Sequence, residues 1–403
     1  MKRSHELFLQ ALSAALKNEY VPWDHPLSRN EWEEILSLAE AHRVLPMVFQ
    51  AVYACPAAKL ADKRLMTFYR SCAIQMVALQ TWKSAEFHPL LQALQEAGIQ
   101  PLVVKGVTCR ELYPNPDHRL SSDEDVLIDP EQFAACHRVL TEFGLTTRDP
   151  DSDSYEIGYV RPDSSLYVEI HRSLFPDEHT AYGDMNRFFT DVRSRAVQQR
   201  GVPTLHPTDH MLYLLCHAFK HFLHSGFGVR QVCDLILYAN AYGSQIDWNY
   251  ILTCCREIRA EQFAAGLFRI GWKYFGFSLE QSRYPLQWQA IYVDETFLLE
   301  DILQAGVYGS ADKDRLHSSS LTLHAVSNQK QGTSGSIFKT LFPSARDMEG
   351  KYPYLKDKPM LLPIAWTDRI LKYSKSTANP SDSIRIANNR IQLLKKYGVL
   401  DNE

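Results

Sequence analysis

The sequence predicts an α+β protein that is mostly helical, with a small mixed sheet between two helical regions. Apolar residues follow a helical period over residues 4–98 and again after residue 200. Between these regions, short apolar segments bounded by Gly, Pro, Asp and Ser have the length and pattern of β-strands. We therefore expect five parts: an N-terminal helical region at 1–98, an α/β core at 99–200, a helical domain at 201–308, a flexible loop or linker at 309–336, and a C-terminal helical segment at 337–403.

The N-terminal region is expected to be helical up to Gly98. Its apolar residues follow a helical period, as in Leu7, Leu9, Leu12 and Leu16, and in Trp32, Ile35, Leu36 and Ala39. Glycine is common directly after a helix because it tolerates the left-handed conformation. Gly98 therefore predicts the end of the last N-terminal helix.

The central region predicts four strands and two helices. A short apolar strand at 99–104 stops at Lys105-Gly106, and a helix at 107–113 should follow it. A second strand at 123–128 precedes Asp129-Pro130, which is typical of an N-cap and first-turn proline, and the helix should run to Phe143. The last two strands, at 155–160 and 166–170, are separated by a turn with the sequence Pro-Asp-Ser-Ser.

The helical period returns after His206-Pro207-Thr208-Asp209, a helix-start signal. Four helices are expected, at about 209–223, 230–242, 248–257 and 260–275. Residues 309–336 are rich in Ser, Gly, Lys and Gln, which indicates a loop or linker. The chain then regains apolar content and should end in a helix of mixed charge.

Composition restricts the partners and the compartment. The formal charge of −4 provides no basic field for binding a long nucleic acid. The eight Cys residues include no C-x-x-C pair, which favours reduced thiols in a cytoplasmic protein. No apolar run approaches the roughly 18 residues of a membrane span, and the N-terminus lacks the apolar stretch of a signal peptide.

Asp123, Asp125 and Glu169 are the candidate metal-binding and catalytic residues. In a strand, Asp123 and Asp125 would project from one face with Cα atoms about 7 Å apart, while Glu124 points away. Two carboxylates on one face can hold a divalent cation, although a solvated acidic turn is the simpler explanation of this pair. Glu169 lies within an apolar strand, where it requires a metal or an ion pair, for example with Arg172.

Several motifs in one order resemble the bacterial nucleotidyltransferase family of the polymerase-beta-like superfamily, in a group that is largely uncharacterised. They are Val103-Val104-Lys105-Gly106, Leu112-Tyr113-Pro114, Arg119, Asp123-Glu124-Asp125-Val126-Leu127-Ile128 and Val168-Glu169-Ile170-His171. Further likeness lies in Ala41-His42-Arg43-Val44-Leu45-Pro46, in 214–221 with Arg230 and Asp234, and in Leu341-Phe342-Pro343-Ser344.

The resemblance implies a small polymerase-beta-like core and transfer of a nucleoside monophosphate from a nucleoside triphosphate, such as ATP, with release of pyrophosphate. Asp123, Asp125 and Glu169 would hold two metal ions, expected to be Mg²⁺ with Mn²⁺ as the alternative. One ion would grip the triphosphate and the other would activate an acceptor hydroxyl.

Lys105, Gly106 and Arg119 are the candidate phosphate-binding residues. Gly106 begins a helix, whose N–H groups can approach a phosphate, and Lys105 adds a positive charge, but a plain strand-to-helix turn explains the pair equally well. Arg119 could clamp phosphate or neutralise the acids. The superfamily usually has Gly-Ser at the Lys105-Gly106 position and a small apolar residue in place of Glu124. If Glu124 faces a core, the strand register expected above is wrong.

His217, Lys220, His221 and His224 share one helix face, which the resemblance places against the cleft, where His217, Lys220 and His221 could contact nucleotide or acceptor. Packing between helices is the alternative role of each histidine. A zinc site at His217 and His221 is disfavoured because Ala218 stands where a zinc protease has glutamate. Arg230 and Asp234, four residues apart, are expected to pair.

The sequence lacks the signature motifs of several other enzyme classes. No Gly-rich dinucleotide or P-loop pattern occurs, and no G-x-S-x-G elbow is present. The acceptor could be a small molecule, a peptide or protein hydroxyl, or a tRNA end, with RNA disfavoured by the charge. The rival from another class is a catalytically silent nucleotide-binding, regulatory or toxin-neutralising partner that retains the fold.

Overall fold

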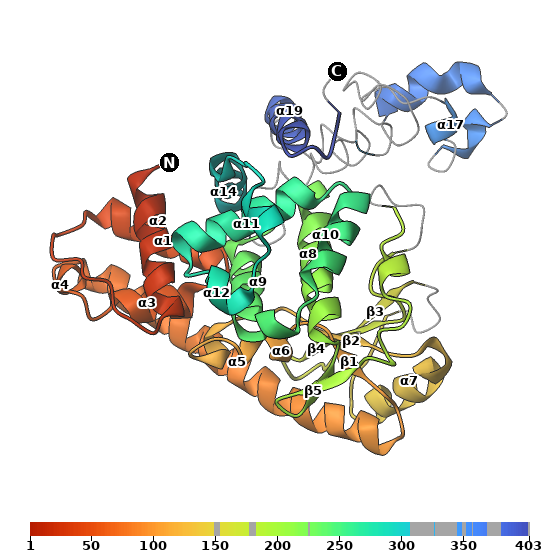
Figure 1. Cartoon of the computed structure of the whole chain (residues 1–403), viewed down its shortest axis with the longest axis horizontal. Coiled ribbons are helices and arrows are strands. Elements are labelled where there is room, and N and C mark those ends of the chain that lie inside the picture. Colours follow the sequence, from red (N-terminus) through yellow and green to blue (C-terminus); the bar gives the residue numbers. More distant parts are fainter. Residues whose placement is uncertain are drawn as a thin grey trace.

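The computed structural model describes residues 1–148, 154–176, 183–224, 226–306, 326, 345–348, 352–356, 358–368 and 380–401. The predicted class is confirmed: the fold is α+β, mostly helical, with a small mixed sheet (Figure 1). Apart from Val326, the loop or linker expected at 309–336 lies outside the described residues, and the five-part division of the chain stays a prediction.

Five helices form the N-terminal region. They are α1 (Arg3–Leu16), α2 (Arg29–Ala41), α3 (Leu45–Val52), α4 (Pro56–Lys59) and α5 (Lys63–Glu96). Local sequence determines where two of them begin, because Ser28 forms a capping box with Glu31 and Asp62 accepts a hydrogen bond from the Leu65 N–H. Gly98 follows α5 with a φ of +78°, as expected for a residue after a helix end. The long helix α5 runs from the N-terminal helices to the sheet (Figure 1).

The central sheet has four strands in the order β1-β2-β4-β3. Their bounds are β1 (Leu102–Val103), β2 (Glu124–Leu127), β3 (Glu156–Val160) and β4 (Tyr167–His171). The pair β2 and β4 is parallel, whereas β1 with β2 and β3 with β4 are antiparallel. The short elements around them are α6 (Val107–Arg110), η1 (Pro116–His118), η2 (Pro130–Gln132), α7 (Phe133–Glu142), η3 (Asn186–Phe188) and the hairpin of β5 (Val197–Gln199) with β6 (Val202–Thr204).

The two faces of the sheet differ in chemistry. Val126, Val168 and Ile170 belong to a hydrophobic cluster that also contains side chains of α5 and α7, including Leu90 and Leu140. Alternation along β2 and β4 turns Asp125, Glu169 and His171 to the opposite face. The acids are therefore carried on strands whose other side is anchored in a packed core.

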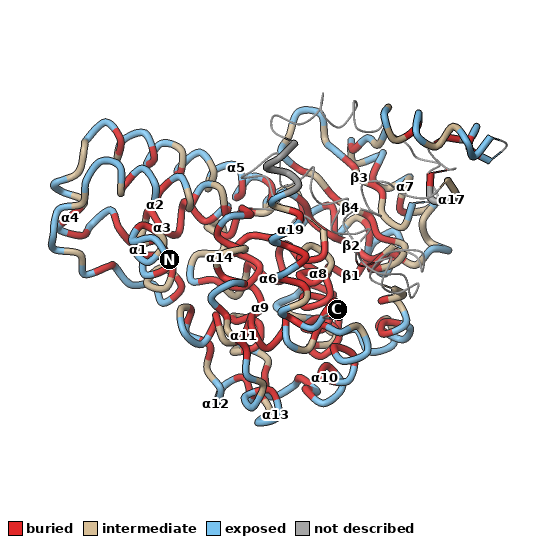
Figure 2. Tube along the Cα trace, turned by 90° about the horizontal axis from the view of Figure 1, so that it is seen from above, coloured by how far each residue is buried: buried red, intermediate tan, exposed pale blue. Residues whose placement is uncertain are grey.

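The second helical region was predicted closely. Its main helices are α8 (Pro207–Leu223), α9 (Val229–Tyr242), α10 (Trp248–Glu257), α11 (Glu261–Tyr274) and α14 (Glu295–Ala305), with the short η4 (Gly243–Gln245), α12 (Leu279–Ser282) and α13 (Leu286–Gln289) between them. The buried side chains of α1–α3 and α8–α11 form one continuous hydrophobic cluster. Figure 2 shows this buried interior, with α8 and α9 almost wholly buried.

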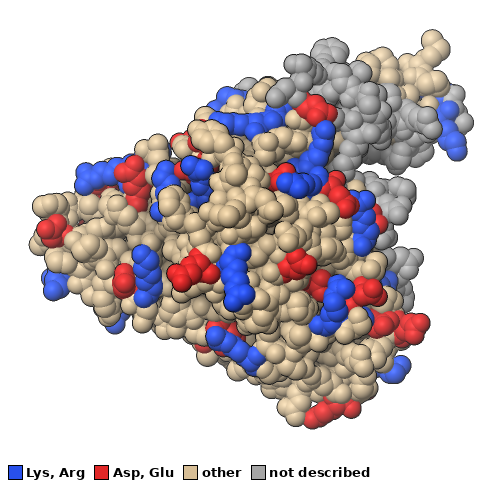
Figure 3. Space-filling view, viewed as in Figure 1, with Lys and Arg blue, Asp and Glu red and all other residues tan. Residues whose placement is uncertain are grey.

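The last described elements are α17 (Ala345–Met348), η6 (Pro353–Leu355), η7 (Pro359–Leu361) and α19 (Pro380–Lys396). The expected C-terminal helix of mixed charge is present as α19. On the face in Figure 3, acidic and basic side chains are interspersed. No helix in the described part of the chain is long and apolar enough to cross a membrane.

The two predicted elements around Lys105 and Gly106 are much shorter in the structure. The strand expected at 99–104 pairs only over Leu102–Val103, and the helix expected at 107–113 spans Val107–Arg110. The Lys105-Gly106 turn separates them, because Gly106 adopts a φ of +67° that ends the extended conformation.

Candidate active site

The carboxylates of Asp125 and Glu169 come together because β2 and β4 are parallel neighbours in which these two residues are paired. His171, two residues beyond Glu169, lies on the same face, and its Nε2 is 3.3 Å from Asp125 Oδ1 and 3.9 Å from Glu169 Oε2. Asp123 immediately precedes β2 and lines the same cavity. The structure thus brings together the three acids that the sequence singled out.

Their cavity has a volume of about 210 Å³ and lies between the sheet and α8. The carboxylates come from the sheet or the residue before β2, Lys105 comes from the turn between β1 and α6, and Lys220 comes from α8. The lining residues are Lys105, Asp123, Asp125, Glu156, Glu169, His171, Leu174, Tyr213, His217, Lys220 and His221. Carboxylates and lysines therefore share one small space.

Lys105 is buried among the acids. Its Nζ lies 3.0 Å from Asp125 Oδ2 and 3.9 Å from Asp123 Oδ2. Burial acts to raise the pKa of Asp125, but the Lys105 ammonium and the hydrogen bond from His171 outweigh it and hold the pKa well below its usual range. Asp125 is therefore ionised at neutral pH, and Lys105 provides the nearest compensating charge.

The pKa of Glu169 is shifted in the opposite direction from that of Asp125. Burial and repulsion from Asp125 and Asp123 raise the pKa of Glu169 to about 7. Lys105 lowers this pKa, but its effect is smaller than those of burial and the two aspartates. The cavity consequently has more carboxylate charge than its cations compensate, a condition that favours binding of an added cation.

Asp125, Glu169 and His171 could hold a metal ion, because one ligand atom from each lies within 4.8 Å of the other two. The donors suit a divalent cation, since carboxylate oxygens bind Mg²⁺ or Mn²⁺ and imidazole favours a transition metal. Asp123 Oδ1 is also buried, with no hydrogen-bond donor among the described residues. It is a further oxygen that a cation could satisfy.

His171 is the site residue that sequence reasoning missed. It belongs to the Val168-Glu169-Ile170-His171 motif, which by itself indicates no role for it. The two-residue period of a strand places His171 on the face of Glu169, and that signal could have identified it.

The basic face of α8 meets the cavity as expected for His217, Lys220 and His221. His217 Nε2 lies 3.5 Å from Lys105 Nζ and 3.3 Å from His221 Nε2. Burial, followed by nearby cations, lowers the pKa of both histidines well below the usual value, so both rings are neutral at pH 7. Lys220 donates a hydrogen bond of 3.2 Å to the Tyr155 hydroxyl, and His224 forms the C-cap of α8.

The expected strand register required that Glu124 not face a core, and the structure corrects this requirement. Its side chain is fully buried and lies on the strand face of Val126, yet Asp125 still faces the cavity. The register holds because the Glu124 carboxylate is paired: Arg110 Nη2 is 2.7 Å from Oε1, and the Val107 N–H donates to Oε2 at 2.9 Å. A buried acid at this position is therefore compatible with the expected strand.

The same contact occupies part of the backbone at which Gly106 was expected to approach a phosphate. The Val107 N–H at the start of α6 is occupied by Glu124. A Cβ at Gly106 would collide with that carboxylate, and the positive φ adds strain for any other residue. Glycine is thus required by the local backbone and by Glu124, and a contact between Gly106 and phosphate stays a prediction.

The Arg119 side chain is bound to Asp234 of α9. Its Nε and Nη2 donate to Asp234 Oδ1 and Oδ2 at 2.8 and 2.7 Å, and the Tyr113 hydroxyl adds a hydrogen bond of 2.8 Å to Oδ1. In the structure Arg119 therefore pairs with Asp234, and a contact between Arg119 and phosphate stays a prediction. The expected pair of Arg230 with Asp234 is replaced, because Arg119 provides a bidentate match and Arg230 donates to the Leu120 carbonyl.

Lys83 of α5 holds the segment that leads into Asp123. Its Nζ donates to the carbonyls of Ser121 and Ser122 at 2.8 and 2.6 Å, and Gln80 accepts a hydrogen bond from the Ser121 N–H. Burial lowers the pKa of Lys83 to about 8. Together with the Arg230 contact to Leu120, this network ties the loop before Asp123 to α5 and α9.

Comparison with known proteins assigns the chain to a family. Residues 28–276 match the model of a family described as an uncharacterised nucleotidyltransferase, which is more than half of the 403-residue chain. No curated protein and no solved structure gives a match. The matched region includes the whole four-stranded sheet and the basic face of α8. The chain therefore belongs to this nucleotidyltransferase family.

Proposed function

We propose that the protein transfers a nucleoside monophosphate from a nucleoside triphosphate to an acceptor hydroxyl. A bond forms between the acceptor oxygen and the α-phosphorus, the bond from the α-phosphorus to the bridging oxygen breaks, and the hydroxyl proton is released with pyrophosphate as the leaving group. The observation that carries this proposal is the pairing of Asp125 with Glu169 across parallel strands, with His171 beside them and Lys105 and Lys220 in the same cavity.

Asp125, Glu169 and His171 would hold a divalent cation, with Asp123 contributing to the same or a second ion. Such ions would supply charge neutralisation at the attacking and leaving oxygens. Asp125 lies in β2 and Asp123 immediately precedes that strand, where the network of Lys83 and Arg230 restricts the loop. Rigid mounting of this kind supports a metal site.

Lys105 and Lys220 are proposed to bind the phosphates. In the described conformation, the Lys105 ammonium neutralises Asp125 and Asp123. When a cation takes over that neutralisation, Lys105 becomes available to a phosphate oxygen as a point charge. Lys220 is already held at the cavity by Tyr155, with its pKa lowered by burial.

The size of the cavity restricts what it holds. Its volume of about 210 Å³ is below the ~300–1,000 Å³ of pockets that enclose whole drug-sized ligands. We expect it to take the triphosphate and cation, with the nucleoside and the acceptor reaching it from outside. His217 and His221, as neutral rings, can each offer one donor and one acceptor to either molecule.

The test measures transfer of the labelled α-phosphate from the nucleotide to an acceptor. Each of the four nucleoside triphosphates, labelled on the α-phosphate, is incubated with protein, Mg²⁺ or Mn²⁺ and a cell extract, and the modified acceptor is identified by mass spectrometry. Asp125→Asn should abolish transfer and retain the fold, because it removes a ligand charge with little change in volume. Asp163→Asn makes the same chemical change at an exposed turn residue and should be fully active.

Equal transfer by wild type and Asp125→Asn would refute the proposal. Metal-dependent nucleotide binding without transfer to any acceptor would favour the rival function, a silent nucleotide-binding partner with the same fold.

A further inference from the structure

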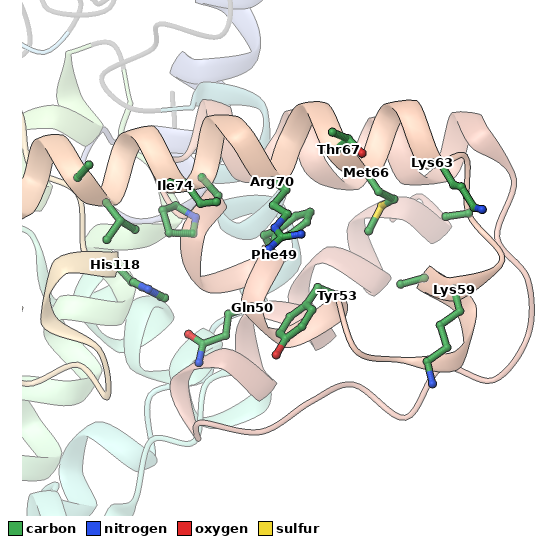
Figure 4. Close-up of a pocket in the computed structure, with 16 residues that line it drawn as sticks. Phe49, Gln50, Tyr53, Lys59, Lys63, Met66, Thr67, Arg70, Ile74 and His118 are labelled. Carbon is green, nitrogen blue, oxygen red and sulfur yellow. The ribbon is translucent and has the colours of Figure 1, made fainter.

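Outside the active site, a groove between α3 and α5 has a volume of about 920 Å³ (Figure 4). It shares no lining residue with the cavity that contains Asp125 and Glu169. In Figure 4, Lys59 and Lys63 lie at one end, His118 at the other, and Phe49 and Arg70 between them. The N-terminal helices thus carry a second candidate binding site.

One face of α5 forms a wall of this groove. Several of the α5 residues that line the groove follow one another at intervals of three or four positions, as expected for a single helix face: Lys63, Met66, Arg70, Ile74 and Val77. The wall from residue 63 to residue 78 extends about 22 Å at ~1.5 Å per residue, or roughly four helical turns. The opposite wall comes mainly from α3, with residues of α4 and η1 at its two ends, so the groove lies between helical segments.

The groove exposes apolar side chains to solvent. Ile74 is 58% exposed and Tyr53 is 52% exposed, although both are large and apolar. Phe49 and Met66 add further apolar surface between them. A contiguous apolar surface framed by polar side chains is typical of a binding site for another molecule.

Every residue of the lining that is charged at neutral pH is basic. Lys59, Lys63 and Arg70 line the groove, and no carboxylate does. These three cations have no ion pair with any described residue, whereas Asp62, next to Lys63, accepts from the Leu65 N–H and pairs with Arg29. The groove therefore combines an apolar floor with an uncompensated positive rim.

We propose that this groove binds an acidic amphipathic helix of a partner protein. Apolar side chains of the ligand, spaced i, i+3, i+4 and i+7, would fill the space lined by Phe49, Met66 and Ile74, and its Asp or Glu residues would meet Lys59, Lys63 and Arg70. A helix fits better than a strand, because both walls are helices and neither offers a row of backbone partners. This function is independent of nucleotide transfer.

The probe is a display library of random 18-residue peptides, selected on the full-length wild-type chain. Enriched sequences should carry apolar residues at helical spacing and Asp or Glu beside them. Their affinity, measured by fluorescence anisotropy, should fall at least ten-fold in the double variant Lys63→Glu/Arg70→Glu and should weaken with increasing salt. Arg64→Glu is the matched control, because Arg64 is exposed on the same helix but does not line the groove.

Circular dichroism of each variant excludes misfolding as the cause of lost binding, and Ile74→Glu tests the apolar floor separately. Failure to enrich any peptide over a no-protein selection would overturn the proposal, as would enriched peptides without acidic residues or binding that the double variant retains. A concentration-dependent dimer of the wild type that Ile74→Glu dissociates would assign the groove to a second copy of this chain, and the proposal would fail.

Discussion

Replacing Lys105 by Met removes the ammonium that lies 3.0 Å from Asp125 Oδ2 and 3.9 Å from Asp123 Oδ2. Met keeps most of the side-chain length and fits an environment in which Lys105 is only 3% exposed. The variant therefore tests the charge and not the packing. Without a metal ion, Asp125 would be left as a buried carboxylate whose remaining close partner is His171, at 3.3 Å.

Removing one partner of a buried ion pair costs about 3–5 kcal/mol of folding free energy. The lower end, about 3 kcal/mol, is expected because Asp125 keeps its contact with His171. A divalent cation bound by the carboxylates replaces the lost charge. At one hundred times its dissociation constant, such an ion stabilises the folded state by about 2.7 kcal/mol, which is nearly the whole loss.

Urea unfolding, followed by tryptophan fluorescence with EDTA and then with Mn²⁺, measures both quantities. Lys17→Met is the matched control, because Lys17 is exposed and lies outside the active-site cavity. Mn²⁺ should stabilise Lys105→Met more than it stabilises the wild type or Lys17→Met. In the same variant, triphosphate should bind more weakly, by at most a few kcal/mol, as for loss of one charge-assisted hydrogen bond.

An unfolding free energy within about 0.5 kcal/mol of wild type in EDTA would refute the inference that Lys105 neutralises buried acids. Destabilisation that Mn²⁺ fails to reverse would contradict the proposed metal site. These two outcomes separate the structural role of Lys105 from the cation-binding role of its neighbours.

Three further predictions concern single contacts. His171→Gln should lower Mn²⁺ affinity by about 10–100-fold, a loss typical of disturbed metal coordination, and isothermal titration measures it. Arg119→Met should cost about 3–5 kcal/mol in urea unfolding, because it leaves Asp234 buried without its bidentate partner. His42 has a pKa lowered to about 4 by burial. Since this folded-state pKa is below the unfolded value near 6.5, its stabilising effect is complete above pH 6.5 and declines toward pH 4, by about 2 kcal/mol between pH 7 and pH 5. His42→Gln should remove that part of the pH dependence from urea unfolding curves.

A specific result would contradict each of these predictions. Unchanged Mn²⁺ affinity in His171→Gln would remove His171 from the site. Full stability of Arg119→Met would mean that the Asp234 pair is dispensable, and an additional Asp234→Asn change should then be neutral too. Equal pH slopes in wild type and His42→Gln would assign the acid sensitivity to other buried histidines, such as His210.

Local patterns accounted for most of the elements. Helical period, caps and turn residues placed α8 to α11 within a few residues of their bounds, because each signal is contained within one segment. The strands of Asp125 and Glu169 were also expected from alternation and apolar runs. Their partnership as neighbouring parallel strands could not be derived from period, since pairing depends on segments more than 40 residues apart.

The partners of charged side chains were the least predictable feature. Arg230 and Asp234 have the spacing of a helical pair, yet Asp234 is bound by Arg119 from another part of the chain. A bidentate guanidinium contact in a buried site is stronger than an i, i+4 pair on a helix surface. Sequence spacing can indicate an i, i+4 pair, but it cannot indicate a bidentate contact between distant segments.

The sequence by itself determined the alternation of helical and strand segments, the three acids and the basic face of α8, because each depends on a local repeat or on residues within a few positions. Only the tertiary structure decided that Lys105 neutralises Asp125, that Glu124 occupies the start of α6, and that His171 completes a candidate metal site. The physical reason is that ionic partners are selected by distance and burial after strands and helices have packed, and packing brings together residues that are remote in the chain.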